Sequence, residues 1–456
     1  MSNKKYTPVI GLEIHVELST NSKMFCGCKN DPFGADAPNS HVCPVCLGMP
    51  GALPVPNRIA IESTVLLGLA LGCSINRYSK FDRKHYRYPD LPKGYQITQY
   101  ELPFCYGSKL MTSEGPVRLR RIHLEEDTAK LLHHSSTAQL TTWHGAKSKG
   151  EESRIDFNRS GVPLMELVTE PDIHCAAQAK EFGKRLRAII VYLGISDADL
   201  ERGNMRLEAS VSLRKEGDTA LPPYKVELKN INSFSFMEKA IQFEIKRQTA
   251  LLEQGIQPAQ ETRGWHEATG ETVLQRSKEN ADDYRYFPDP DIPPIELSEE
   301  LLNELKAVIP ELPGAKVERW KKDYGIEERY GVLLSDDREE AEKWNTLFSA
   351  LKKESVHVAD FVKDVANKKT AFTNQTPVAD IQEHYHAKKT ADAPSPEKIT
   401  EAVAAVIAEN AKAVADFRGG SEKAVMFLLG MVFKKLRTKL GADSIREELL
   451  NTLKKK

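Results

Sequence analysis

The stretch that determines the fold of the first half of the chain is Val9-Ile10-Gly11-Leu12-Glu13-Ile14-His15-Val16-Glu17-Leu18. Apolar and polar side chains alternate here with a period of two, which is typical of a β-strand with one buried face. The aliphatic residues at even positions are expected to face the core. Glu13, His15 and Glu17 then lie together on the opposite face, where they can meet polar side chains of neighbouring strands.

Similar alternation predicts two further strands, at residues 205–214 and 224–230. Three stretches instead have the period of an amphipathic helix, namely residues 58–72, 175–193 and 236–254. The last two are followed by Gly194 and Gly255, which suit a left-handed residue after a helix. Strands and helices that mix without strict βαβ alternation predict an α+β fold.

The length of 456 residues exceeds what one ordinary core accommodates, so we expect two or three domains. Proline-rich breaks at residues 286–294 and 390–396 suggest the boundaries. We predict a mixed α/β domain over residues 1–295, an all-α domain over residues 296–393 and a small helical tail domain over residues 394–456.

The charge balance excludes one class of protein. Lys plus Arg number 64 and Asp plus Glu number 65, for a net charge of −1, so the chain does not coat nucleic acid through bulk positive charge. A local basic patch is still possible. From residue 418 onward there are ten basic and four acidic residues, which suits phosphate contact, although a solvated helical face is the alternative.

The sequence lacks the signals that direct a protein into or across a membrane. The longest apolar run, residues 65–71, is far shorter than the ~18–20 residues that cross a bilayer. The N-terminal lysines are not followed by the hydrophobic segment of a secretory signal. We therefore expect a cytoplasmic protein with no membrane partner.

The cysteines form the strongest local motif. Seven cysteines in a chain without an export signal argue against a disulfide framework. Cys26-Gly27-Cys28 is followed after fourteen residues by Cys43-Pro44-Val45-Cys46, and two such pairs can supply four thiolates to one tetrahedral Zn²⁺. Four protein ligands leave no open position, so we predict a structural zinc knuckle over residues 26–46. Redox pairing and free thiols are the alternatives.

Acidic residues recur on the predicted strands. Glu126 lies in a run of three acids, Glu166 lies inside an apolar segment, and Glu208 and Glu227 lie on polar strand faces. Any one of them alone is typical of a solvated sheet. Together with Glu13 they predict an oxygen-rich Mg²⁺ site whose coordination shell is completed by substrate phosphates. The candidate partners for phosphate charge are Lys80, Arg83, Lys84, Arg206 and Lys229.

Missing motifs narrow the chemistry further. The sequence contains no Gly-x4-Gly-Lys-Ser/Thr loop and no Gly-x-Gly-x-x-Gly after a predicted strand, which disfavours a P-loop NTPase or a Rossmann enzyme. It also lacks the Gly-x-Ser-x-Gly nucleophile elbow.

Several motifs, taken in order along residues 6–295, resemble the B subunit of the tRNA-dependent amidotransferases. Besides the opening strand they include Lys80-Phe81-Asp82-Arg83-Lys84, His123-Leu124-Glu125-Glu126-Asp127, Glu227-Leu228-Lys229-Asn230-Ile231-Asn232-Ser233-Phe234 and Asp282-Asp283-Tyr284-Arg285-Tyr286-Phe287-Pro288. That family converts Glu-tRNA(Gln) or Asp-tRNA(Asn) into Gln-tRNA(Gln) or Asn-tRNA(Asn). Its B subunit phosphorylates the misacylated side-chain carboxyl with ATP, a glutaminase (the A subunit) supplies ammonia, and a small C subunit joins the two.

The resemblance implies that the first domain is a kinase-like cradle that uses ATP, Mg²⁺ and misacylated tRNA, with the zinc knuckle retained. The catalytic residues that it implies are Glu13, His15 and Glu126. The implied Mg²⁺ ligands are Glu13, His15, Glu126, Glu166 and Glu208, and the last replaces the family's usual aspartate, which changes its reach. The residues assigned to nucleotide or substrate binding are Lys80, Arg83, Arg206, Glu227, Lys229 and Asn230.

The second half departs more from the family pattern. Asp360-Phe361 replaces a usual Asn-Trp pair, and residues 438–443 stand where the family has a Gly-x-Ala-x-Pro element. Two alternatives are considered. An archaeal-type paralogue that serves only Glu-tRNA(Gln) carries a large insertion, for which this chain has no room. A non-catalytic, zinc-containing tRNA-binding scaffold would not need the retained acids and His15.

Overall fold

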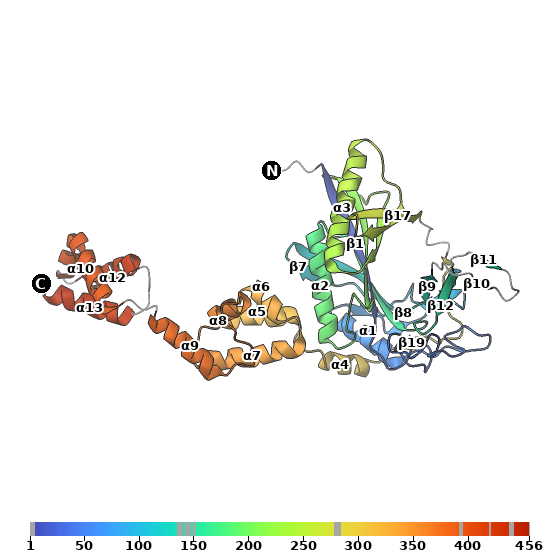
Figure 1. Cartoon of the computed structure of the whole chain (residues 1–456), viewed down its shortest axis with the longest axis horizontal. Coiled ribbons are helices and arrows are strands. Elements are labelled where there is room, and N and C mark those ends of the chain that lie inside the picture. Colours follow the sequence, from blue (N-terminus) through green and yellow to red (C-terminus); the bar gives the residue numbers. More distant parts are fainter. Residues whose placement is uncertain are drawn as a thin grey trace. The chain divides into compact units, whose positions relative to one another are not determined.

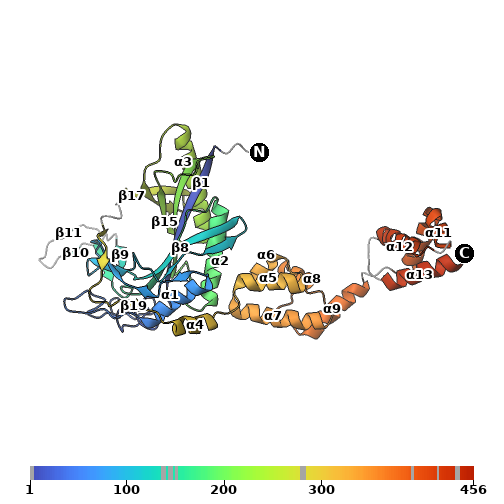
Figure 2. The ribbon, with the colours of Figure 1, turned by 180° about the vertical axis from the view of Figure 1, so that it is seen from behind.

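The structure is a computed structural model that describes residues 5–134, 140–141, 147–148, 152–277, 284–391, 395–418, 421–436 and 442–455. The chain divides into two compact units, Met1–Glu318 with Ser335–Arg338, and Arg319–Leu334 with Glu339–Lys456. All the described strands belong to the first unit (Figures 1 and 2). Asp282 and Asp283 of the tyrosine-rich motif, and tail residues 438–441, lie outside the described residues.

A ten-stranded sheet forms the centre of the first unit, in the order β17-β16-β15-β14-β1-β13-β8-β6-β2, with β7 also paired to β8. Its strands are β1 (Tyr6–Glu17), β2 (Ser74–Ile75), β6 (Cys105–Tyr106), β7 (Lys109–Thr112), β8 (Gly115–Glu126), β13 (Pro163–Thr169), β14 (Met205–Lys215), β15 (Val226–Ile231), β16 (Glu261–His266) and β17 (Glu271–Ser277). The pair β15–β16 is parallel. This mixed sheet, combined with helices, confirms the α+β prediction.

Strand β1 has the two faces that its sequence predicts. Leu12, Ile14 and Val16 are buried in the core, whereas Glu13 and His15 lie on the other face and are half-buried. Strand β1 pairs with β14 along most of its length and with β13 on its other side. This central position carries the polar face of β1 into the middle of the sheet.

Three helices cover the apolar face of the sheet, and side chains such as Phe182, Leu186 and Ile241 join Ile14 in one core. Gly194 and Gly255, just beyond two of these helices, have φ values of +67° and +76°, as their sequence positions predict. The helices are α1 (Arg58–Ala70), α2 (Ala176–Tyr192) and α3 (Phe234–Glu253).

Small strand pairs complete the first unit and bring distant segments together. A three-stranded sheet joins β4 (Asp82–His85) to β5 (Tyr95–Thr98) and to β18 (Phe287–Pro288). The proline-rich segment therefore returns to the first unit. The other pairs are β3 (Tyr78–Ser79) with β19 (Ile295–Glu296), β9 (Lys130–His134) with β12 (Glu152–Asp156), and β10 (Leu140–Thr141) with β11 (Lys147–Ser148).

The first unit continues beyond residue 295, because Leu297 and Leu302 belong to the same core as the sheet. Helix α4 (Glu299–Ala307) carries the second of these leucines. The three-domain division with boundaries at residues 295 and 393 stays a prediction.

All regular secondary structure in the described residues that follow α4 is helical. Its helices are α5 (Pro313–Tyr324), α6 (Glu328–Leu334), α7 (Arg338–Lys353), α8 (Val358–Ala366), α9 (Val378–Ala391), α10 (Pro396–Glu409), α11 (Ala411–Arg418), α12 (Glu422–Leu436) and α13 (Ala442–Lys455). Trp320 and Phe348 make an edge-to-face contact 5.2 Å apart between α5 and α7. Helices α10–α13 enclose their own core, which includes Val403, Leu428 and Leu449 (Figure 2). Across the described ranges, no helix combines the length and apolar character that a membrane crossing requires.

Candidate functional site

The polar face of the central sheet carries a row of titratable side chains. His15 of β1 pairs in register with Glu166 of β13, and Glu166 pairs with His123 of β8. On the other side of β1, Glu13 lies opposite Glu208 of β14. Because directly opposite residues on neighbouring strands project to the same face, the sheet brings together groups that are far apart in the sequence.

The centre of this row is close enough to share one cation. Nε2 of His15 lies 3.3 Å from Glu166, 3.6 Å from Glu13 and 3.9 Å from Glu125. Nε2 of His123 lies 3.5 Å from Glu166 and 3.8 Å from Glu125. The possible ligand atoms of Glu13, His15 and Glu166 all lie within 4.8 Å of one another, as do those of His123, Glu125 and Glu166. We call these five residues the acid cluster.

The protonation behaviour of the acid cluster reflects burial and crowding. Burial and the charge of Glu166 raise the pKa of Glu13 to about 7. Burial opposes the charged form of His15, but the hydrogen bond and charge of Glu166 raise its pKa to about 9. Burial also opposes ionisation of Glu166, yet His123 and His15 hold its pKa well below the usual range. The cluster therefore favours positive charge at its centre, which a divalent cation supplies.

Of the residues predicted to bind Mg²⁺, the structure brings Glu13, His15 and Glu166 together. Glu208 lies opposite Glu13 on β14, and its carboxylate forms an ion pair of 2.7 Å with the ammonium group of Lys229. The carboxylate oxygens fit a hard divalent ion such as Mg²⁺. The imidazole of His15 could ligate a metal only in its neutral form. The assignment of these residues as Mg²⁺ ligands stays a prediction.

The structure places Glu126 apart from the acid cluster. Its Oε1 atom lies 2.6 Å from Nζ of Lys93 and accepts the backbone N–H of Ile97 at 3.0 Å. The neighbouring Glu125 takes the place beside His15, where its Oε2 atom accepts a hydrogen bond of 3.0 Å from the hydroxyl of Thr98. A direct catalytic role for Glu126 thus stays a prediction, whereas its ion pair with Lys93 ties β8 to the segment before β5.

Our sequence reasoning did not select His123 or Glu125 as site residues. The signal was present, because His123 and Glu125 are separated by the buried Leu124 and therefore face the same side of β8. Choosing among three consecutive acids required the pairing of β8 with β13, which no single strand reveals.

The cations predicted to bind nucleotide or substrate are already paired with carboxylates. The pairs are Lys80 with Glu101, Arg83 with Asp289, Arg206 with Asp127 and Lys229 with Glu208, at 2.7, 2.8, 2.6 and 2.7 Å. Such pairing neutralises charge that a phosphate would otherwise meet. Arg206 interacts electrostatically with Glu125, and Lys229 with Glu13. A direct phosphate role for the four cations stays a prediction.

Lys84 differs from these four cations. Its Nζ atom lies 5.0 Å from the ring centroid of Tyr284 and 5.9 Å from that of Tyr86. Within the described part of the chain, no carboxylate comes within 4.0 Å of this ammonium group. Burial opposes its charge, but Glu125 and, more weakly, Glu166 raise its pKa above the usual range. Lys84 therefore presents a charge at the edge of the acid cluster that no direct ion pair neutralises.

Two predicted substrate residues lie on β15, next to β14. Asn230 has φ +60°, a conformation that is uncommon outside glycine, near an irregularity in the pairing of β14 with β15. Glu227 pairs with Lys225 at 3.4 Å. Both belong to the strand that carries Lys229, one strand removed from β1, and their role in substrate binding stays a prediction.

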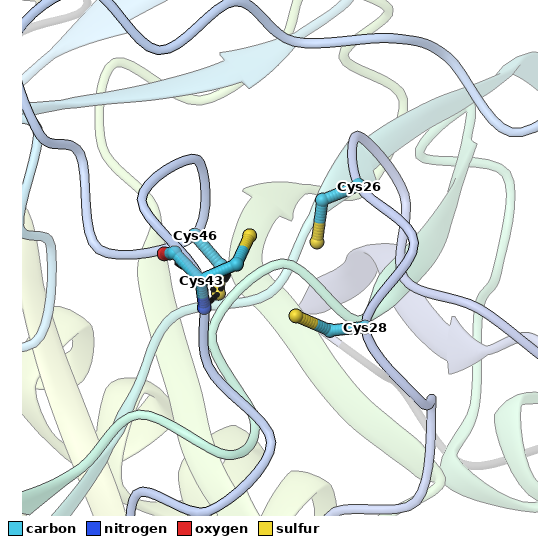
Figure 3. A group of neighbouring side chains, drawn as sticks. All are labelled: Cys26, Cys28, Cys43 and Cys46. Atoms are coloured by element: carbon cyan, nitrogen blue, oxygen red, sulfur yellow. Dashed lines mark hydrogen bonds between the residues drawn. The ribbon is translucent and has the colours of Figure 1, made fainter.

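The four cysteines of the predicted knuckle converge in the loop between β1 and α1. Figure 3 shows Cys26 and Cys28 facing Cys43 and Cys46. All four Sγ atoms lie within 4.8 Å of one another. Four thiols directed to one point fit a shared tetrahedral ion better than two separate redox pairs. The cluster can hold a metal, and the donor set fits Zn²⁺.

Local hydrogen bonds favour the thiolate form of one member of this cluster, Cys46. The backbone N–H of Cys43 donates to Sγ of Cys46 at 3.0 Å. A hydrogen bond from the thiol of Cys26, this backbone N–H and the charge of Lys23 lower the pKa of Cys46 to about 5, against the effect of burial. The thiolate is the form that binds metal, and the fold favours it at Cys46. A hydrogen bond with Cys46 and burial raise the pKa of Cys26, and burial raises the pKa of Cys28 to about 11, so these two thiols lose their protons when a metal binds.

Two known protein families match most of the chain. The GatB/GatE catalytic domain family matches residues 8–303, and the GatB domain family matches residues 345–453. The acid cluster and the cysteine cluster both lie within the first match.

Named relatives agree with these families. Proteins named as the B subunit of aspartyl/glutamyl-tRNA(Asn/Gln) amidotransferase, from Thermodesulfovibrio yellowstonii and Thermomicrobium roseum, are each 42% identical to this chain. The first alignment covers 99% of this chain and 100% of the relative, and the second covers 95% of each. A relative with the same name from Symbiobacterium thermophilum is 48% identical over 75% of this chain and 68% of its own length.

Proposed function

The chain belongs to the GatB family of amidotransferase B subunits, and on this basis we propose that it activates the side-chain carboxyl of Glu-tRNA(Gln), Asp-tRNA(Asn) or both with ATP. The acid cluster is the observation that carries the proposal. It gathers Glu13, His15, Glu125 and Glu166 around one point beside the ammonium of Lys84.

The proposed reaction has two steps. A carboxylate oxygen of the aminoacyl side chain attacks the γ-phosphorus of ATP, the bond from that phosphorus to the bridging oxygen breaks, and ADP leaves. Ammonia then attacks the carbonyl carbon of the acyl phosphate, inorganic phosphate departs with the electrons of the C–O bond, and the nitrogen loses a proton to give the amide. Neither step requires a covalent nucleophile from the protein, which agrees with the lack of a nucleophile motif in the sequence.

The chain's own residues contribute charge and position. Glu13, His15 and Glu166, with Glu125 beside them, would hold Mg²⁺, which when bound neutralises phosphate charge. Lys84 would bind an oxygen of the transferred phosphoryl group, because its ammonium lacks a direct carboxylate partner in the described structure. The ion pair of Glu208 and Lys229 would form one wall of the site.

The cysteine cluster has a separate role in this proposal. Cys26, Cys28, Cys43 and Cys46 would hold a structural Zn²⁺, since four thiolates leave no position for a substrate. The ion would fix the long loop that precedes α1. It therefore supports the fold of the cradle and takes no part in the reaction.

The relatives are named B subunits, which supports the presence of further subunits. We assign ammonia production to a glutaminase (the A subunit) and the connecting role to a small C subunit. The basic tail would contact tRNA. Since aminoacyl-tRNAs are made and used in the cytoplasm, the proposal also places the chain there.

The test is release of ADP by the assembled complex supplied with ATP and MgCl₂ but neither glutamine nor ammonia. We expect ADP release only when misacylated tRNA is added, and parallel reactions with Glu-tRNA(Gln) and Asp-tRNA(Asn) identify the substrate. Correctly charged Gln-tRNA(Gln) is the control. Binding of misacylated tRNA without any ADP release would refute the proposal and favour the non-catalytic scaffold.

A further inference from the structure

Two tyrosines from distant parts of the sequence form a stack with one open face. Tyr100, just after β5, and Tyr286, just before β18, have ring centroids 4.2 Å apart and planes inclined by 11°. Tyr100 is 43% exposed. The backbone N–H of Tyr100 donates to Asp82 at 3.0 Å, which fixes the segment that carries the ring. The outer ring is therefore held in place while part of it remains open to a planar group.

This stack is continuous with the acid cluster. Thr98, two residues before Tyr100, donates its hydroxyl hydrogen to Glu125 at 3.0 Å. Gln99 accepts the backbone N–H of Leu124 at 3.1 Å. Burial raises the pKa of Tyr286 to about 12, and the charges of Lys84, Glu125 and Glu166 also act on it. The two rings thus stand beside the groups assigned to phosphoryl transfer.

We propose that the open face of Tyr100 stacks on the 3′-terminal adenine of the aminoacyl-tRNA. This proposal rests on the proposed function and specifies how its substrate is positioned. Single-stranded RNA ends are recognised by stacking of unpaired bases on aromatic side chains. Stacking suits this position because every tRNA ends in the same base, so no base-specific hydrogen bonds are needed.

The covalent structure of aminoacyl-tRNA places its terminal base near the reacting carboxyl. In aminoacyl-tRNA, the terminal adenine is joined to the reacting carboxyl through one ribose, an ester and a short side chain. The base must therefore bind near the acid cluster. In ATP the ribose and two phosphates separate the adenine from the reacting phosphorus, a comparable span, so the adenine of ATP is the competing occupant that the experiment must distinguish.

The test uses the full-length chain in its complex and uncharged tRNA in which 2-aminopurine replaces the terminal adenine. We expect wild-type protein to quench the probe, and Tyr100→Ala to weaken tRNA binding roughly tenfold and to abolish the quenching. Tyr100→Phe keeps the ring and should match the wild type. Tyr106→Ala is the control, because Tyr106 is 45% exposed on β6 and lies outside the stack.

Two outcomes would overturn the proposal. One is unchanged quenching with Tyr100→Ala, and the other is an increase in the KM for ATP with no change in tRNA binding, which would assign the ring to the adenine of ATP. The binding assay contains no ATP, so it does not depend on the reaction. Quenching by wild-type protein that releases no ADP would refute the proposed function and leave the base site intact.

A second inference comes from Lys23, next to the cysteine cluster. Its side chain is fully buried, and Nζ donates to the carbonyl oxygens of His41 at 2.8 Å and Phe157 at 3.2 Å. No carboxylate of the described residues lies within ion-pair distance. A Cβ atom built on Gly161 would meet both Cys46 and Lys23, at 3.6 and 3.7 Å, so the stem of Lys23 runs beside a predicted ligand.

A buried ammonium group without a carboxylate partner is costly unless another negative charge compensates it. Four thiolates around Zn²⁺ carry a net charge of −2, which is also costly to bury. We infer that Lys23 is a positioning residue that strengthens zinc binding by compensating this charge and by holding the loop at His41 to the turn at Phe157.

The test measures transfer of zinc from the full-length chain to a chromogenic chelator. Lys23→Met is expected to weaken zinc binding on the order of tenfold to a hundredfold. Lys29→Met is the matched control, because Lys29 lies on the same loop but is 63% exposed and paired with Asp31. Equal zinc affinity in the two variants would overturn the inference.

A thermal unfolding measurement separates charge compensation from simple packing. The zinc-free Lys23→Met protein should lose less stability than the zinc-bound variant, because removal of a buried charge partly offsets the loss of the hydrogen bonds to His41 and Phe157. If the zinc-free variant loses as much stability as the zinc-bound variant, the role of Lys23 is structural and the inference fails.

Discussion

Replacing His15 by alanine is expected to lower tRNA-dependent ADP release by a factor on the order of a hundred to a thousand. His15 lies within 3.9 Å of Glu13, Glu125 and Glu166, so its loss removes a ligand and leaves the carboxylates crowded. Lys84→Met should give a loss of similar size, because it removes the ammonium group that we propose to bind the transferred phosphoryl group. The measurement is single-turnover ADP release by the assembled complex.

Controls distinguish lost chemistry from lost folding. His266→Ala removes an exposed imidazole from β16 of the same sheet and should leave ADP release unchanged. Both active-site variants should retain zinc and bind tRNA, since neither residue contacts the cysteine cluster in the described structure. Wild-type rates in both His15→Ala and Lys84→Met would show that the acid cluster is not the site of phosphoryl transfer.

Replacing Cys26 or Cys43 by serine is expected to remove about one zinc ion per chain. The four Sγ atoms lie within 4.8 Å of one another, so deleting one ligand opens the tetrahedral site. The loop between β1 and α1 contains no helix, so a bound ion would contribute much to its order. We therefore also expect faster proteolysis within residues 20–57. Metal analysis and limited proteolysis of the purified chain provide the two measurements.

Cys175→Ser is the matched control for these variants. Its thiol caps the N-terminus of α2 by accepting the N–H of Gln178 at 3.4 Å, a task that serine performs well. This variant should keep both its zinc and its resistance to proteolysis. Stoichiometric zinc in the Cys26→Ser and Cys43→Ser proteins would refute the placement of the ion.

The local sequence was sufficient to predict elements that depend on the backbone conformation of neighbouring residues alone. The alternation around Leu12 and Ile14 predicted β1, because a pleated strand places successive side chains on opposite faces. Gly194 and Gly255 marked helix ends, because the left-handed conformation there favours glycine. The spacing of the four cysteines likewise suggested one cluster before any fold was known.

The local sequence pattern does not predict which distant strands pair with each other. Arg83 and Asp289 are 206 residues apart and make a 2.8 Å ion pair, because β18 returns to β4. The same return places Tyr286 on Tyr100. The proline content of residues 286–294 predicted a domain boundary. Nothing in this local composition identifies β4 as the strand with which the segment pairs.

The sequence by itself therefore determined strand β1, the placement of Glu13 and His15 on its polar face and the donor set of the metal knuckle. Only the tertiary structure decided that Glu125 joins these two residues, that Glu126 instead pairs with Lys93, and that Lys84 lacks a direct carboxylate partner among the described residues. The reason is physical. Backbone periodicity fixes the face on which a side chain lies, whereas strand register and the burial of neighbouring charges fix what it meets there.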